Sequence, residues 1–279
     1  MRSDAKKSFY FHTDANSLGG FLEEPFKKII PSQASASLPA VGGYATTRTE
    51  NFNFEEIISC RSAYTRVSGR EVRQDGPWSV LVTSVVEELN ILEIVKAERV
   101  VAQLSVEYLR EGGFPRISLA GSHFDHLRIG GYDAFPAMNP GLMDTGRDAE
   151  TSRSRVPWSS FQKTGREQAG KLLKSIRGDK EGYAARGLAE RFEWMDSDRD
   201  LEDDGLVLCS LVDGVDREIP GTSFCHVLEI PDFGRIFLGE LLVSPASIQL
   251  TMVRAELGCN VQGQASAATG KVGGHMVPP

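Results

Sequence analysis

The sequence predicts a mainly β fold, sandwich-like or irregular in architecture, with an inserted helical hairpin. Along residues 1–140, β-branched and aromatic residues lie between clusters of Gly, Pro, Asn and Asp, and this strand pattern returns along residues 205–268. Between these segments, residues 141–204 contain a polar linker and stretches with apolar side chains at helical spacing. We therefore expect residues 205–268 to complete the β domain that residues 1–140 begin.

The N-terminal half is built from short segments with strand signals. The segment SFYFHT is rich in aromatic residues, and EEIISCRSAYTRVSGREV alternates apolar and polar residues before a Ser-Gly turn signal. The segment GPWSVLVTSVV follows a Gly-Pro breaker. We expect a strand in each of these segments.

The stretch Ser84–Tyr108 is the longest strongly apolar one, and its pattern fits either an amphipathic helix or two strands and a turn. Its first half keeps helical spacing at Val85, Val86, Leu89, Leu92 and Val95. From Val100 onward every second residue is apolar or small, which favours a half-buried strand. Six valines and two isoleucines also disfavour a helix, because β-branched side chains restrict χ1. We predict strand–turn–strand, with a helix over 84–95 as the alternative.

The segment GRIFLGELLVSPASIQLTMVRAEL, residues 234–257, repeats this layout. Both stretches hold a Glu followed by two aliphatic residues, then a short break, then alternating apolar residues. The two patterns align only if a shift of one residue is allowed. The later one carries Pro245 at its break, which a continuous helix tolerates poorly. We expect strand pairs in both.

The predicted insertion, residues 141–204, begins with the polar segment MDTGRDAETSRSRVP, which is typical of an exposed linker. Two stretches with helical spacing follow, formed by Trp158, Phe161, Gly165, Ala169, Leu172, Leu173 and Ile176, and by Ala184, Leu188, Phe192 and Met195. Pro157 suits the start of the first helix. At the other end of the chain, residues 269–279 are small, Gly-rich and Pro-rich, and we expect a flexible tail there.

Composition and charge narrow the classes of protein. The net charge is -7, from 31 basic and 38 acidic residues, and no Lys/Arg-rich stretch is present, which argues against nucleic acid as a partner. No run of apolar residues is long enough for a secretory leader or a transmembrane helix. The four cysteines form no C-x-x-C pair. We expect a cytoplasmic protein with reduced thiols, although export without a cleavable signal stays open.

The run VVEELNILEIVKAERVVAQLS, followed by GSHFDHLRIGGY, resembles the β-rich domains of bacterial surface proteins grouped as choice-of-anchor families. The resemblance covers roughly residues 35–132 and, more faintly, 219–257. It rests on aliphatic pattern and turn glycines. It implies a bacterial, extracellular β domain of unknown biochemical role, and it supplies no catalytic residues.

Candidate metal ligands are His123, Asp125 and His126 in GSHFDHL, with His226 in SFCHV as a further candidate. Imidazole and carboxylate are ligands that zinc prefers. On a strand, however, His123 and Asp125 share one face while His126 points to the other. The acidic segment DSDRDLEDD lacks the Gly and Glu that a calcium loop requires at its sixth and twelfth positions, so an EF-hand is excluded. We therefore predict no cofactor.

No sequence motif identifies an enzyme. The chain has no G-x-S-x-G nucleophile elbow, and its Gly pairs match neither a P-loop nor a dinucleotide fingerprint. The interpretation we favour is a non-catalytic structural or self-assembling β-rich protein that forms homo-oligomers or docks with an assembly partner.

Two alternatives remain open at this point. One is a ligand- or glycan-binding β module with a face lined by Trp78, Tyr108 and Tyr132. The other is a metal-dependent enzyme that uses His123, Asp125 and His126.

Overall fold

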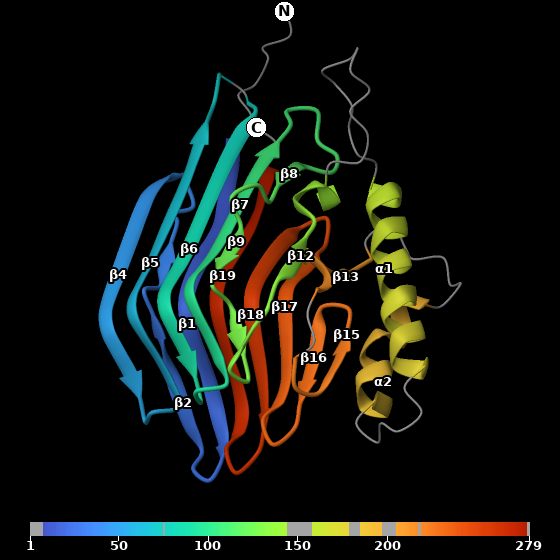
Figure 1. The fold of residues 1–279 in the computed structure, drawn as a ribbon. Coiled ribbons are helices and arrows are strands. Elements are labelled where there is room, and N and C mark those ends of the chain that lie inside the picture. Colours follow the sequence, from blue (N-terminus) through green and yellow to red (C-terminus); the bar gives the residue numbers. More distant parts are fainter. Residues whose placement is uncertain are drawn as a thin grey trace, which may run out of the picture.

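A computed structural model describes residues 8–74, 76–143, 158–178, 185–196, 205–216 and 219–277. Two antiparallel sheets pack face to face as a sandwich, and a pair of helices lies along one side (Figure 1). The predicted fold class, mainly β with a helical hairpin, is confirmed.

The first sheet, here called sheet A, contains nine strands and has the order β15-β16-β17-β18-β19-β1-β2, with β13 paired to β17 and β3 paired to β1. Its strands are β1 (Ser8–Glu24), β2 (Lys28–Gln33), β3 (Ala36–Ser37), β13 (Val207–Ser210), β15 (Thr222–Phe224), β16 (Val227–Ile230), β17 (Gly234–Val243), β18 (Ser247–Gly258) and β19 (Gln262–Val277). The first and last strands of the chain are therefore neighbours within one sheet.

The second sheet, here called sheet B, contains eight strands and has the order β11-β10-β7-β6-β5-β4, with β8 and β9 also paired to β7. Its strands are β4 (Gly43–Phe54), β5 (Ile58–Glu71), β6 (Trp78–Ile91), β7 (Val95–Tyr108), β8 (Arg116–Ser118), β9 (His123–Asp125), β10 (Arg128–Ile129) and β11 (Tyr132–Asp133). A small two-stranded sheet of β12 (Pro136–Met138) and β14 (Val212–Val215) pairs with neither large sheet, although β14 contacts β15 and β17 of sheet A.

The helical insertion consists of α1 (Trp158–Gly178) and α2 (Ala185–Asp196), preceded by a short 3₁₀ helix at Pro140–Met143. The two helices contact each other, so the predicted hairpin of helices is confirmed. The apolar face of α1 packs inward through Leu172, Leu173 and Ile176. These side chains bury Phe224, Val227 and Phe237 of sheet A. No described helix combines the length and the apolar character needed to cross a bilayer.

The stretch Ser84–Tyr108 forms two strands joined by a turn, as predicted. Its helix-like spacing has a structural cause. Glu88 has a positive φ of 53°, and there the strand changes which residues face the core. Val86 and Leu89 are consequently both buried, three residues apart as on a helix face.

Strands of both sheets contain such a point, at which the alternation between core-facing and solvent-facing residues is reversed. In sheet B it lies at Asn51 of β4 and Glu88 of β6, and in sheet A at Gly239 of β17 and Ala268 of β19, all with positive φ. The register of strand pairing continues unchanged on either side of these positions. The shift of one residue between the two echoing sequence stretches arises at their turns, because Ile91 pairs with Val95 whereas Val243 pairs with Ile248.

One prediction about the C-terminus is wrong. Residues 269–277, expected as a flexible tail, belong to β19. They pair with β1 on one side and with β18 on the other. The small residues that suggested flexibility permit close packing, since a Cβ on Gly270 would lie 2.7 Å from Val82 of sheet B. The acidic segment 197–204 and the linker 144–157 lie outside the described residues.

Candidate assembly surface

Strand β4 forms one edge of sheet B, and eight of its 12 residues are exposed. It pairs with β5 on one side, and on its other side no strand among the described residues pairs with it. None of its 12 residues is fully buried, and none is proline. A row of main-chain N–H and C=O groups at such an edge can accept a further strand.

Strand β2 forms the neighbouring edge of sheet A and differs from β4 in three ways. It has only 6 residues, it contains Pro31, and its pairing with β1 shifts register between Leu18 and Gly20. Proline has no N–H to donate, and an irregular short edge pairs poorly with another chain. Of the two edges on this side of the sandwich, β4 is therefore the one open to strand addition (Figure 1).

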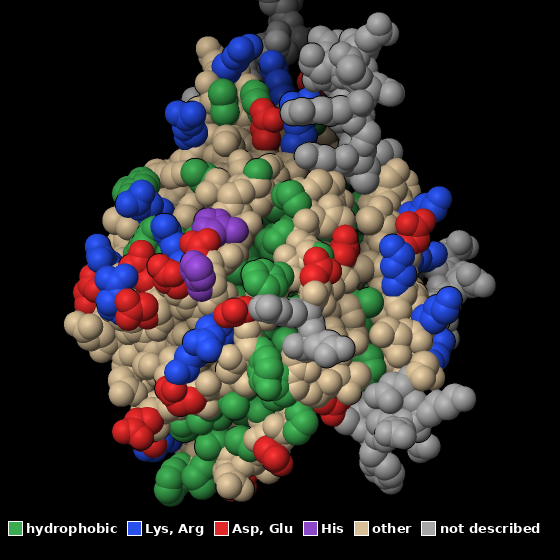
Figure 2. All heavy atoms as spheres, viewed as in Figure 1, with side chains coloured by type: hydrophobic (Ala, Val, Ile, Leu, Met, Phe, Trp, Pro, Cys, Tyr) green, Lys and Arg blue, Asp and Glu red, His purple; other side chains and the backbone are tan. Residues whose placement is uncertain are grey.

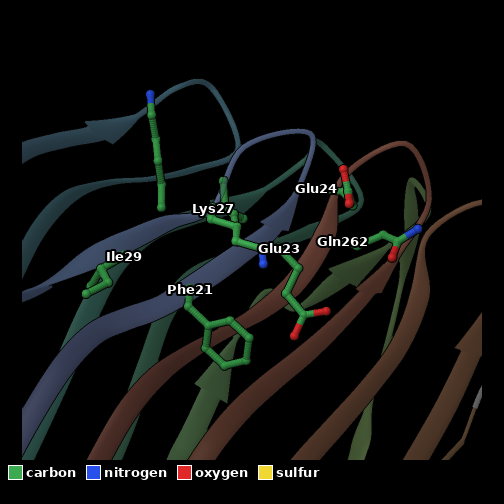
Figure 3. A pocket seen from close by; sticks show the side chains of 8 residues that line it. Phe21, Glu23, Glu24, Lys27, Ile29 and Gln262 are labelled. Atoms are coloured by element: carbon green, nitrogen blue, oxygen red, sulfur yellow. The ribbon is translucent and has the colours of Figure 1, made fainter.

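The tip of the β1–β2 hairpin carries a shallow groove of about 570 Å³. It is lined by Phe21, Leu22, Glu23, Glu24, Lys27, Lys28, Ile29 and Gln262. Phe21 and Ile29 are directly opposed across the two strands, and Figure 3 shows them with Glu23 and Lys27 around the opening. Phe21 is 43% exposed and Ile29 is 79% exposed, so the floor of the groove offers apolar surface to solvent.

Two of the three aromatic residues predicted to line a binding face belong to the core. Trp78 is 2% exposed and Tyr108 is 8% exposed. The Trp78 ring stacks on Phe9, with ring centroids 5.2 Å apart, and the Tyr108 ring is tilted against Phe9, with centroids 4.7 Å apart. Burial raises the pKa of Tyr108 well above its ordinary value. Tyr132, at 58% exposed, is the only one of the three on the surface. The structure thus contradicts the predicted aromatic face, because the side chains of Trp78 and Tyr108 point between the sheets.

The predicted metal ligands separate into pairs. His123 Nε2 lies 3.5 Å from the Asp125 carboxylate, and His126 Nε2 lies 3.5 Å from Glu98. His126 follows the end of β9 and has a positive φ of 49°, so the alternation expected for a strand does not extend to it, and its side chain is 80% exposed. A second groove, of about 360 Å³, has His126 and Glu98 in its wall. Within the residues that the structure describes, no three His, Cys, Asp or Glu side chains converge as a metal site would require.

His226 is buried beneath the helices instead of lying near the other histidines. Its ring is 6.1 Å from that of Phe192 on α2, in an edge-on arrangement. Neither ring nitrogen has a hydrogen-bond partner among the described residues. Desolvation lowers the pKa of His226 to about 4, so the ring is neutral at pH 7.

A buried ionic cluster lies beside His226, and sequence reasoning missed it. Arg254 of β18 forms two hydrogen bonds with Glu240 of β17, one of them 2.8 Å from Nη2 to Oε1, and also pairs with Glu256. Arg191 of α2 reaches Glu256 at 2.6 Å. The Arg254 guanidinium stacks 3.7 Å above the ring of Phe237. The single hint in the sequence was a set of charged residues inside strongly apolar strands.

Opposite charges in this cluster stabilise the ionised forms of Arg254 and Glu256. Burial alone would lower the pKa of Arg254, but the hydrogen bonds and charge of Glu240 raise it above its ordinary value. Burial alone would raise the pKa of Glu256, but Arg254 and Arg191 lower it. Arg254 and Glu256 are therefore ionised at pH 7, and the contacts of Arg191 with Glu240 and Glu256 link α2 to sheet A.

The family model described as "Domain of unknown function (DUF8256)" matches residues 9–244 of this chain. The chain belongs to that family. The match runs from β1 to the end of β17, and nothing in it connects DUF8256 with choice-of-anchor domains. Comparison with curated proteins and with solved structures gives no match for the chain.

Two cysteines of this DUF8256 chain are held as neutral thiols by burial. Cys60 and Cys209 are buried, and all four cysteines are free thiols. Burial raises the pKa of Cys60 to about 11 and raises that of Cys209 further, so neither is ionised at pH 7. Among the described residues, the outer side of β4 has no paired strand, and the β1–β2 tip exposes the apolar side chains of Phe21, Phe26 and Ile29.

Proposed function

We propose that this DUF8256 protein is a non-catalytic structural protein that assembles with copies of itself by pairing β4 strands. The observation that supports this proposal is the β4 edge, which has 12 residues, no proline and no strand on its outer side among the described residues. Natural edge strands of this length are usually covered or blocked, because they pair readily with other chains.

Pairing of β4 with β4 of a second copy is antiparallel about a two-fold axis, so the same surface serves on both sides. It joins two sheets B into one continuous sheet and satisfies the outward main-chain groups of both edges. The inner side of β4 is already held in place, since Thr47 donates to the carbonyl of Ser35 and Thr49 accepts from the amide of Ala34. A fixed edge loses little conformational freedom when it pairs.

The test is sedimentation velocity with light scattering on the intact chain and on a variant with a charged edge. Thr46→Glu with Arg48→Glu, together with Glu50, places three acidic side chains in the middle of β4, so that two β4 strands paired about their centres bring like charges close together. We expect the variant to lose self-association through this edge.

The matched control is Ser105→Glu with Arg116→Glu on β7 and β8, which changes the charge by the same amount on the opposite flank of sheet B. It should associate like the unaltered chain. An intact chain that stays monomeric at high concentration would contradict the proposal.

A further inference from the structure

The β1–β2 tip carries exposed apolar side chains in an unusual concentration. Phe26, in the turn between the strands, is 60% exposed, and Ile29 and Phe21 lie beside it at 79% and 43%. Figure 2 shows hydrophobic and charged side chains mixed at this end of the molecule. Exposed apolar groups gathered in this way mark contact surfaces in soluble proteins.

The β1–β2 tip has a projecting aromatic side chain, Phe26, next to a groove. Phe26 stands in the turn, with the Lys28 ammonium 5.6 Å from the centre of its ring. The groove lined by Phe21, Leu22 and Ile29 lies next to it, and its volume of about 570 Å³ is ample for one aromatic ring.

The charges of the tip are self-complementary. Glu23 and Glu24 lie at the end of β1, and Lys27 and Lys28 lie at the turn and the start of β2. A two-fold contact between two tips brings the lysines of each copy toward the glutamates of the other. An anionic membrane would be repelled by the two glutamates and by Glu55, which already pairs with Lys28. The mixture of charges therefore favours a second copy of this chain over a lipid surface.

We propose that the β1–β2 tip is a second self-contact, in which Phe26 of each copy enters the groove of the other. Because each copy then has two separate two-fold contacts, one at β4 and one at the tip, it joins two different neighbours and the assembly extends as an open chain. The extension rests on the proposed function, since it requires β4 pairing as well as the tip.

The first experiment compares variants of the full chain by sedimentation velocity and negative-stain microscopy. The tip variant is Phe26→Ser, the edge variant is Thr46→Glu with Arg48→Glu, and Tyr132→Ser is a control at another exposed aromatic residue. We expect assemblies larger than dimers for the intact chain and the control, dimers for each single-contact variant, and monomers when both contacts are altered.

The outcomes separate the two proposals. A tip variant that assembles like the intact chain, or an edge variant that is monomeric, would overturn the tip contact and leave β4 pairing in place. An edge variant that assembles like the intact chain would overturn β4 pairing and leave the tip contact in place.

The second experiment tests charge complementarity in the edge-variant background, where only the tip can associate. One tip is made wholly acidic by Lys27→Glu with Lys28→Glu, and the other wholly basic by Glu23→Lys with Glu24→Lys. Each alone should be monomeric, and an equimolar mixture should form dimers. A mixture that stays monomeric, while the parent edge variant dimerises, would rule out the paired-charge geometry.

Discussion

The two flanks of this sandwich both carry ion pairs, which are buried on one flank and exposed to solvent on the other. On the closed flank, α1 and α2 cover β15–β17, and the ionic cluster of Arg254 and Glu240 is buried beneath them (Figure 1). On the open flank, β2 and β4 end the sheets, and the ion pair of Lys28 with Glu55 is exposed to solvent. Charged groups thus connect α2 to sheet A on the closed flank and remain accessible to solvent on the open flank.

This difference shows that burial, more than residue type, decides how much an ion pair contributes to the free energy of unfolding. A buried charge that loses its partner keeps its desolvation cost, whereas an exposed one is rehydrated. Mutations on the closed flank should therefore change the free energy of unfolding. Mutations on the open flank should change assembly and leave folding almost unaltered.

The largest effect is expected from Arg254→Ala on the closed flank. It leaves Glu240 buried without its main partner and removes the guanidinium from Phe237. We expect the free energy of unfolding to fall by about 3–5 kcal/mol, measured by urea denaturation. Lys163→Ala, at an exposed ion pair on α1, is the control and should cost far less. A decrease of less than about 1 kcal/mol in the free energy of unfolding for Arg254→Ala would show that the cluster does not stabilise the contact of α2 with sheet A.

The next largest effect concerns pH and His226. Its pKa is lowered to about 4 in the folded protein, from the ordinary value of 6.5. The unfolded chain therefore binds a proton at a higher pH than the folded protein does. Above pH 6.5 the His226 ring is neutral in both states and costs no stability. As the pH falls toward 4, protonation of the unfolded chain lowers the free energy of unfolding by about 3 kcal/mol. The variant His226→Phe should lose less stability than the parent between pH 7 and 4, in urea denaturation at both values. Equal losses would contradict a buried neutral imidazole.

A small effect on folding is expected from Glu55→Gln on the open flank. This change removes the ion pair with Lys28, whose two side chains are 41% and 46% exposed. We expect a loss of no more than about 1 kcal/mol in the free energy of unfolding, and the loss should shrink further in high salt. A loss as large as that of Arg254→Ala would remove the contrast between the flanks.

The smallest effect on folding is expected from Pro31→Thr, which instead changes assembly. Threonine restores an N–H to the exposed β2 edge and favours strand conformation. The free energy of unfolding should change by less than about 0.5 kcal/mol, while light scattering should detect larger or less regular assemblies. Unchanged assembly would show that the short length and shifted register of β2 block this edge without the proline.

Much of the local structure could be predicted from the sequence. Periodicity of three and four residues located the helices, and alternation located the strand that ends at Tyr108. Prediction failed at the aromatic face, because Trp78 and Tyr108 fit a strand whichever side they occupy. Which side faces the core depends on the other sheet of the sandwich, and that sheet includes Phe9, whose ring contacts both side chains.

The sequence by itself determined which segments become strands and helices, since side-chain period and breaker residues act over a few neighbouring positions. Only the tertiary structure decided which strands are edges and which charges are buried. Arg254 meets Glu240 and Arg191 through the pairing of β17 with β18 and the docking of α2, and no local pattern records these long-range contacts. The C-terminal segment likewise became an inner strand because β1, from the other end of the chain, lies beside it.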